Sequence, residues 1–131
     1  MNGALPWAAA LLLAIPLGVA AQPDLARGEQ VYGRCLACHA IEQHRTGPAH
    51  CGLFGRLAGS AKGFAFYSDA MKRSGIVWGD ATLDRFLADP MAALPGTSMT
   101  YLGVTDAAER RDLVAWLKRA TQPGSACRPA H

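Results

Sequence analysis

The most informative segment of the sequence is Cys35-Leu36-Ala37-Cys38-His39, which has the pattern C-x-x-C-H. Two thiols three positions apart on a helical turn can each add to one vinyl group of a single haem. The residue that follows them, His39, then lies beneath the iron and offers a ring nitrogen as the proximal ligand. The motif therefore predicts one covalently bound haem c per chain, attached through Cys35 and Cys38.

Other uses of a C-x-x-C pair fit this sequence less well. A thioredoxin-like redox dithiol needs a βαβ context, and the sequence has no credible strand pattern. A zinc site needs a second pair of ligands, but the two remaining cysteines, Cys51 and Cys127, lie far apart in the chain.

The N-terminal segment Met1–Ala21 predicts a cleaved signal peptide. It has no charged side chain, an apolar centre from Trp7 to Ile15, and small residues up to Ala21. Its apolar stretch, interrupted by Pro16, is short for a membrane span, which takes about 20 residues, although a retained anchor is the alternative. Export would place residues 22–131 in the periplasm, with no stable membrane insertion after cleavage.

An exported protein with an even number of cysteines favours a disulfide. We expect Cys51 and Cys127 to pair and so to tie the C-terminal tail, from about residue 122, to the loop after Pro48. Two free thiols are the alternative.

Length and composition indicate one folded domain. The 131 residues are half apolar and 18% charged, which excludes an intrinsically disordered chain. A net charge of +3 without a basic run gives no sign of nucleic-acid binding.

N-caps and apolar spacing predict an all-α fold. The expected helices cover about residues 25–34 after the N-cap Asp24, residues 68–74, a segment from Asp80 or Thr82 that ends at Asp89-Pro90, and a final helix from Thr105-Asp106 with Glu109 as capping-box partner. Residues 39–63 and 91–101 are expected to be loops. A loop as long as 39–63 makes sense only if it wraps something.

A six-coordinate haem needs a second axial ligand. The candidates are His44, His50, His131, Met71, Met91 and Met99. Met99 is preferred because it follows a rigid Pro95-Gly96 turn, far enough downstream of His39 to cross over the ring. A lone methionine is more often core filler, so the residues alone leave the choice open.

The sequence resembles class I cytochromes c, the short soluble type of mitochondria and bacteria, over about residues 24–121. The resemblance rests on segments that occur in the same order and spacing: 35–39, Thr46-Gly47-Pro48 with 52–56, 63–72, Gly75-Ile76-Val77-Trp78, and Pro90 with 95–99 followed by a helix ending at 113–118. It implies the cytochrome c fold, in which several short helices and long loops surround one covalently bound haem.

The resemblance also implies roles for individual residues. Met99 would be the distal iron ligand, and the Pro48 carbonyl would accept a hydrogen bond from His39. The haem propionates would be held by Arg56, Tyr67 and Trp78 on the inner side and by Thr97 near the outer one. Gly28 and Tyr32 would meet Trp116 where the terminal helices cross.

The implied function is one-electron transfer without enzyme activity, because a His/Met-ligated iron has no open site for a substrate. Expected partners are redox proteins such as a membrane cytochrome complex, a dehydrogenase or a terminal oxidase, and the chain is expected to be a monomer. The alternatives are a dedicated electron-transfer subunit of one oxidoreductase or, with a vacant sixth site, a haem peroxidase or gas sensor.

Some positions depart from this family pattern. Phe86 stands where relatives usually carry tyrosine, and Met71 where they often carry asparagine, so we expect a drier pocket and a reduction potential at least as positive as is typical. His50 replaces an aliphatic residue. We expect it to form a local hydrogen bond, and iron ligation by His50 at high pH is the alternative.

The segment expected at the exposed haem edge is uncharged, because Met91, Ala92, Ala93 and Ser98 replace the lysines of mitochondrial relatives. The sequence has only three lysines. We therefore expect weaker electrostatic steering toward an acidic partner.

Overall fold

The computed structural model describes residues 1, 3, 14 and 16–128. Most of the predicted signal peptide and the candidate ligand His131 lie outside this range. The elements in chain order are α1 (Leu25–Tyr32), the 3-10 turn η1 (Gly33–Cys35), α2 (Asp69–Arg73), α3 (Asp80–Ala88), α4 (Pro90–Ala93) and α5 (Ala107–Ala120). The described residues form no sheet, and their only β pairings are isolated bridges at Leu57–Val77 and Pro123–Cys127. The predicted all-α class is thus confirmed.

The helices begin where short polar side chains cap them. Asp24 accepts a hydrogen bond from the backbone N–H of Arg27 (3.0 Å), and Ser68 accepts one from that of Met71 (3.1 Å). Each bond satisfies an N–H that the first helical turn leaves without a partner. The predicted starts of α1 and α2 are therefore confirmed.

One predicted loop contains a helix. Residues 91–101 were expected to be irregular, but Pro90–Ala93 forms the short helix α4, capped by the Asp89 side chain, which accepts from the N–H of Ala92 (3.1 Å). Proline lacks only an N–H that would be unpaired at the first helical position. Asp89-Pro90 therefore ends α3 and also begins the next helix.

The predicted capping box at α5 forms only in part. Asp106 accepts from the N–H of Glu109 (2.8 Å). The Glu109 carboxylate instead accepts two hydrogen bonds from the Arg34 guanidinium, at 2.7 and 2.8 Å. A guanidinium that matches both carboxylate oxygens is a stronger partner than one backbone N–H.

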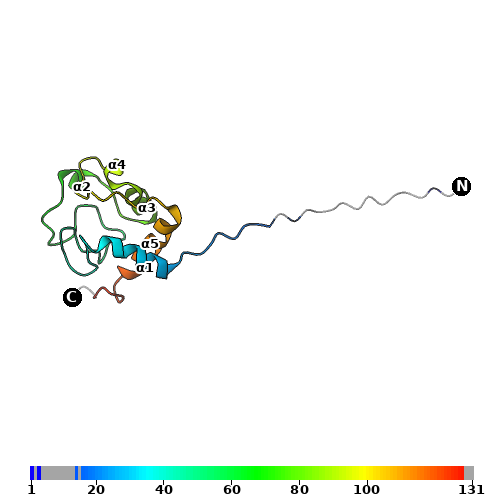
Figure 1. The fold of residues 1–131 in the computed structure, drawn as a ribbon, viewed down its shortest axis with the longest axis horizontal. Coiled ribbons are helices and arrows are strands. Elements are labelled where there is room, and N and C mark those ends of the chain that lie inside the picture. The colour runs from blue at the N-terminus through cyan, green and yellow to red at the C-terminus, as the bar shows by residue number, and fades with distance from the viewer. Residues whose placement is uncertain (2, 4–13, 15, 129–131) are drawn as a thin grey trace.

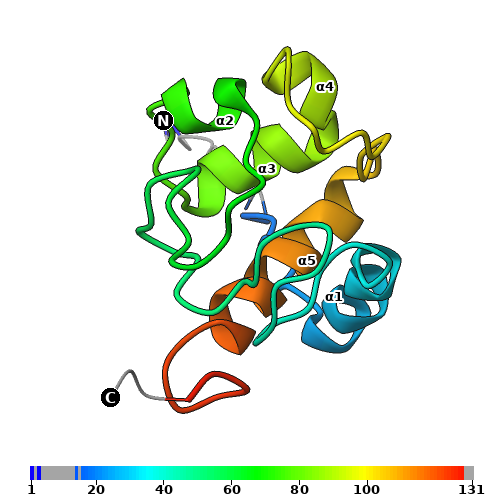
Figure 2. The same ribbon diagram turned by 90° about the vertical axis from the view of Figure 1, so that its left-hand side faces the viewer.

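The terminal helices α1 and α5 pack against each other (Figure 2), and their backbones come close together at Gly28. A Cβ on Gly28 would collide with the backbone carbonyl of Asp112 and lie 2.7 Å from the Cβ of Trp116. The rings of Tyr32 and Trp116 pack at a centroid distance of 4.8 Å. These contacts confirm the predicted meeting of Gly28 and Tyr32 with Trp116.

A fully buried carboxylate joins the same two helices. Asp112 on α5 accepts from the backbone N–H of Asp24 (3.1 Å) and forms ion pairs with Arg27 and Arg111. Nothing in the sequence around Asp112 marks this residue as buried, so its role could not be predicted.

The hydrophobic core lies between α1, α3 and α5. The buried side chains that these three helices contribute to it are Val31, Tyr32, Leu83, Phe86, Leu87, Leu113, Val114 and Leu117. The long segment between η1 and α2 runs as loops along one side of these helices (Figures 1 and 2), so the predicted loop at 39–63 is confirmed. Within the described residues, no helix has both the length and the hydropathy needed to cross a bilayer.

Candidate functional site

A cavity of about 390 Å³ lies between the loops and the core helices. All of the predicted site residues line it: Cys35, Cys38, His39, Pro48, Arg56, Tyr67, Trp78, Thr97 and Met99. Its size is in the range of small-molecule and cofactor sites. The fold therefore brings together residues that are up to 64 positions apart in the sequence, from Cys35 to Met99.

The two motif cysteines are on one tight turn at the cavity wall. The backbone N–H of Cys38 and that of His39 both donate to the carbonyl of Cys35, at 3.1 and 2.9 Å. Both thiols are unpaired. Burial raises the pKa of Cys35 to about 11, so this thiol is protonated at neutral pH. A redox dithiol would need a stabilised thiolate, which this environment does not supply.

The His39 imidazole has a defined tautomer. Its Nδ1 lies 2.8 Å from the carbonyl oxygen of Pro48. Because a carbonyl can only accept, Nδ1 carries the proton and Nε2 keeps a free lone pair for a metal. Burial also lowers the pKa of His39, which favours the neutral form that binds iron.

The backbone of Gly47 abuts the same ring. A Cβ at this position would collide with Cε1 of His39 and lie 2.6 Å from its Nδ1. Glycine is required here by this close approach, since any larger residue would displace the imidazole.

Of the candidate sixth ligands, Met71, Met99 and His50 line the cavity, whereas His44 and Met91 do not. The His50 ring is stacked on that of His39, with centroids 4.4 Å apart and planes inclined by 26°. His50 thus lies beside the proximal ligand and not across the cavity from it, a position that does not favour ligation by His50 at high pH. The two methionines remain as candidates for the opposite side.

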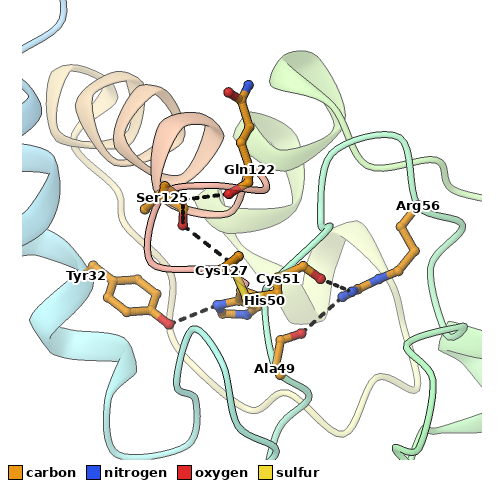
Figure 3. The surroundings of a disulfide bond; sticks show 9 residues. Tyr32, Ala49, His50, Cys51, Arg56, Gln122, Ser125 and Cys127 are labelled. Atoms are coloured by element: carbon orange, nitrogen blue, oxygen red, sulfur yellow. Dashed lines mark hydrogen bonds between the residues drawn. A yellow bond between two sulfur atoms is a disulfide. The ribbon is translucent and has the colours of Figure 1, made fainter. Parts of the chain in front are cut away.

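Arg56 is a partly buried cation at the cavity wall. Its guanidinium donates to the carbonyls of Ala49 (3.2 Å) and Cys51 (3.0 Å), and burial lowers its pKa (Figure 3). In the described part of the chain, no carboxylate lies within ion-pair distance of it. An anionic group in the cavity would offset this charge, and a haem propionate has that chemistry.

The hydroxyls of the other predicted propionate residues, Tyr67 and Thr97, accept hydrogen bonds from the backbone, which leaves each O–H able to donate to an anion. The Tyr67 hydroxyl accepts from the backbone N–H of Ala61 (3.0 Å), and the Thr97 hydroxyl accepts from that of Met99 (3.2 Å). The Trp78 ring packs on Phe86 at a centroid distance of 5.1 Å. The apolar side chains, the thiols, the free imidazole nitrogen and the partly buried cation together fit a haem c.

His50 forms the local hydrogen bond that the sequence predicted. Its Nδ1 lies 3.0 Å from the hydroxyl of Tyr32. Burial lowers the pKa of His50 to about 3, and burial raises the pKa of Tyr32, so both groups are neutral at pH 7. That Tyr32 is the partner, and that His50 stacks on His39, could not be predicted from their separation in sequence.

The predicted disulfide is present. Cys51 and Cys127 are bonded, with their Cα atoms 5.5 Å apart, and they join the C-terminal tail to the loop that follows Pro48 (Figure 3). Leu83, Leu87 and Leu113 also line the cavity, and this role was not predicted from the sequence. Helical spacing identifies a buried face but not whether that face meets the core or a cofactor.

Comparison with known proteins gives the family. A family model described as Cytochrome c matches residues 25–121. A cytochrome c2 of Blastochloris viridis is 44% identical over 117 residues, which cover 87% of this chain and 91% of that protein. A cytochrome c of Chlamydomonas reinhardtii is 45% identical over 102 residues, covering 75% and 90% respectively.

The solved structure of cytochrome cH from Methylobacterium extorquens is also similar, with a TM-score of 0.70 and 43% identity over 72% of this chain and 97% of that one. The sequence, the fold and the cavity agree with these matches. The chain belongs to the cytochrome c family, whose members are electron carriers with one covalently attached haem c and are not enzymes.

Proposed function

We propose that this protein carries single electrons on a haem c whose iron is ligated by Nε2 of His39 and the sulfur of Met99. The observation that carries the proposal is the His39 imidazole: the Pro48 carbonyl holds its Nδ1, its Nε2 keeps a lone pair, and the residue lines the same cavity as Met99. When bound, the haem supplies an iron that alternates between the ferric and ferrous states.

Met99 is favoured over Met71 for two reasons. The residues from Pro95 onward form a turn in which the N–H of Thr97 donates to the carbonyl of Leu94 (3.0 Å) and the Thr97 hydroxyl holds the N–H of Met99. The resemblance to class I cytochromes c also assigns the ligand to Met99. A thioether ligand stabilises ferrous iron and raises the potential.

The remaining residues keep the site rigid and dry. Trp78, Leu83 and Phe86 are buried and line the cavity, so they exclude water from the iron. Cys35 and Cys38 tether the cofactor. Arg56, with Tyr67, Trp78 and Thr97, would bind the propionates. His39 and Met99 would hold the iron in both redox states, so electron transfer would need little movement of the chain.

The compartment and partners follow from other features. The Met1–Ala21 pattern and the Cys51–Cys127 disulfide support export to the periplasm. There a monomer would exchange electrons with membrane or soluble redox proteins at the exposed haem edge.

The ligand set can be tested with absorption spectra of the purified haem-loaded protein. Ferric Met ligation gives a weak band at the red end of the spectrum. We expect this band in the wild type and in Met71→Leu, and its loss in Met99→Ala. A wild-type protein without the band would overturn His/Met ligation, and loss of the band in Met71→Leu but not in Met99→Ala would reassign the ligand.

A further inference from the structure

The His50 ring stacks on the ring of His39, the proposed proximal ligand. The centroid of the His50 ring lies 4.4 Å from that of the His39 ring, and the two planes are inclined by 26°. The other restraints on the His39 ring are the Pro48 carbonyl at Nδ1 and the Gly47 backbone. The hydrogen bond to Pro48 fixes the position of Nδ1, but the His39 ring can still rotate about the axis of that hydrogen bond. The stacked His50 ring opposes this rotation.

Tyr32, at the end of α1, holds the His50 ring in place. The hydroxyl of Tyr32 is 3.0 Å from its Nδ1, and the two rings meet edge to face at 5.8 Å (Figure 3). The Tyr32 ring also packs on Trp116 of α5, with the ring centroids 4.8 Å apart. A continuous series of rings therefore leads from the crossing of the terminal helices to the iron ligand.

The backbone on both sides of His50 is held as well. The N–H groups of His50 and Cys51 both donate to the carbonyl of Ile41, at 2.9 and 3.0 Å. The Arg56 guanidinium binds the carbonyls of Ala49 and Cys51, and Cys51 is bonded to Cys127. These contacts restrain both the backbone of His50 and the Nδ1 side of its ring.

We infer that His50 is a positioning residue for the axial ligand: its ring, anchored by Tyr32, sets the orientation of the His39 imidazole plane about the bond from Nε2 to the iron. This inference rests on the proposed ligation of the haem iron by His39. An aliphatic residue of similar volume would fill the same space, but it has neither a flat face for the imidazole nor an atom that Tyr32 can bind.

The test is proton NMR of the ferric haem-loaded protein. The shifts of the four haem ring methyl groups depend on the orientation of the axial imidazole plane, so their order and spread report it. We expect His50→Leu to change the order or spread of these four shifts. Tyr32→Phe, which removes only the hydroxyl and keeps the packing on Trp116, is expected to change them in the same direction by a smaller amount.

A matched control is His44→Leu, the same substitution in the same loop. His44 also has two hydrogen bonds, to the Lys62 carbonyl and from the Ala49 N–H, but it does not line the cavity. We expect this variant to lose thermal stability and to keep the wild-type methyl pattern. A methyl pattern in His44→Leu that matches that of His50→Leu would overturn the inference, because the effect would then be general loosening of the loop.

Unchanged methyl shifts in both His50→Leu and Tyr32→Phe would also overturn it. If His50→Leu does not fold, Tyr32→Phe decides alone. The far-red Met band of the wild type is recorded on the same samples, so failure of the proposed Met ligation is seen separately from failure of this positioning role.

Discussion

Gly47 lies so close to the His39 ring that a side chain at this position would collide with the imidazole. Gly47→Ala would place a methyl group against Cε1 of the imidazole. We expect a destabilisation of about 1–3 kcal/mol from overpacking and a reduced ratio of haem to protein after expression. Pyridine haemochrome assay and thermal unfolding measure the two effects.

Gly33→Ala is the control for this substitution. Gly33 has a helical φ of −50°, and a Cβ there meets no atom within 4 Å. It should bind haem normally, with unchanged or slightly higher stability. Equal haem content in the two variants would show that the Gly47 contact does not restrict the ligand.

The cavity position of Phe86 leads to a prediction about the reduction potential. Phe86 is 5% exposed and packs on Trp78, with no polar atom of its own near the iron. Phe86→Tyr adds a hydroxyl that solvates ferric iron better, so we expect the potential to fall. A net contribution of about 1 kcal/mol would correspond to roughly 40 mV for one electron. Redox titration measures it, and a clear rise would contradict the dry-pocket explanation.

At the scale of the elements, the crossing of α1 and α5 depends on the buried Asp112. Burial by itself raises the pKa of this carboxyl, but the Asp24 N–H and the guanidinium of Arg27 outweigh it and hold the pKa below the usual value. The Asp112 carboxylate therefore stabilises the fold at pH values above the unfolded-state pKa of aspartate, about 3.9. This stabilisation is lost as the pH falls through the lower pKa of the folded state.

We expect Asp112→Asn to lower the free energy of unfolding at pH 7 by about 1.5–3 kcal/mol, the range for hydrogen bonds to charged groups. The difference from wild type should shrink as the pH falls below 4. Urea unfolding at several pH values tests this. Asp84→Asn removes the half-exposed carboxylate that pairs with Arg110 but leaves Arg110 its bonds to the carbonyls of Val104 and Thr105, so it should cost at most about 1 kcal/mol. A pH-independent difference for Asp112→Asn would show that its charge does not matter.

The disulfide acts between the tail and the loop that carries His50. Closing the segment between Cys51 and Cys127, 76 positions apart, stabilises the fold by roughly 4 kcal/mol in the chain-entropy model. Cys51→Ser/Cys127→Ser should therefore lower the free energy of unfolding by up to this amount. Urea unfolding with and without a thiol reductant measures it, because reductant should weaken only the wild type. Thiols that alkylate freely in the unreduced wild type would disprove the bridge.

At the scale of the whole molecule, several positive charges near the haem site are already neutralised or engaged. Arg34 pairs with Glu109, Lys72 pairs with Asp69, and the Arg45 guanidinium binds the carbonyl of Leu36. Two of these cations are thus paired with carboxylates, and segment 91–93 is uncharged, so we expect only a weak positive field around the cavity mouth.

We therefore expect the rate of oxidation by an anionic oxidant such as hexacyanoferrate(III) to fall by less than about tenfold from low to high ionic strength, at the lower end of electrostatic steering effects. Stopped-flow measurements across a salt series test this. Glu109→Gln frees the Arg34 charge and should increase the salt dependence. A steep decrease in the wild type would contradict a neutral docking face.

Much of the fold could be predicted because the signals are local. Asp24, Ser68 and Asp106 bond to N–H groups three positions away, so the helix starts are encoded by neighbours. The helix α4 was missed because Asp89-Pro90 has two valid interpretations, as a terminator and as a start. The loss of the complete capping box could not be predicted, because the Glu109 carboxylate binds Arg34, which is distant in the sequence.

The sequence by itself predicts haem attachment through Cys35 and Cys38 with His39 as the proximal ligand, since this chemistry depends only on spacing within one turn. Pairing of Cys51 with Cys127 was also predictable, because the four cysteines leave one partner for each after the motif is assigned. The stacking of His50 on His39, its bond to Tyr32 and the burial of Asp112 were decided only by the tertiary structure. Each depends on how loops and helices far apart in the chain are brought within a few ångströms, and that arrangement follows from packing of the whole core and not from any run of adjacent residues.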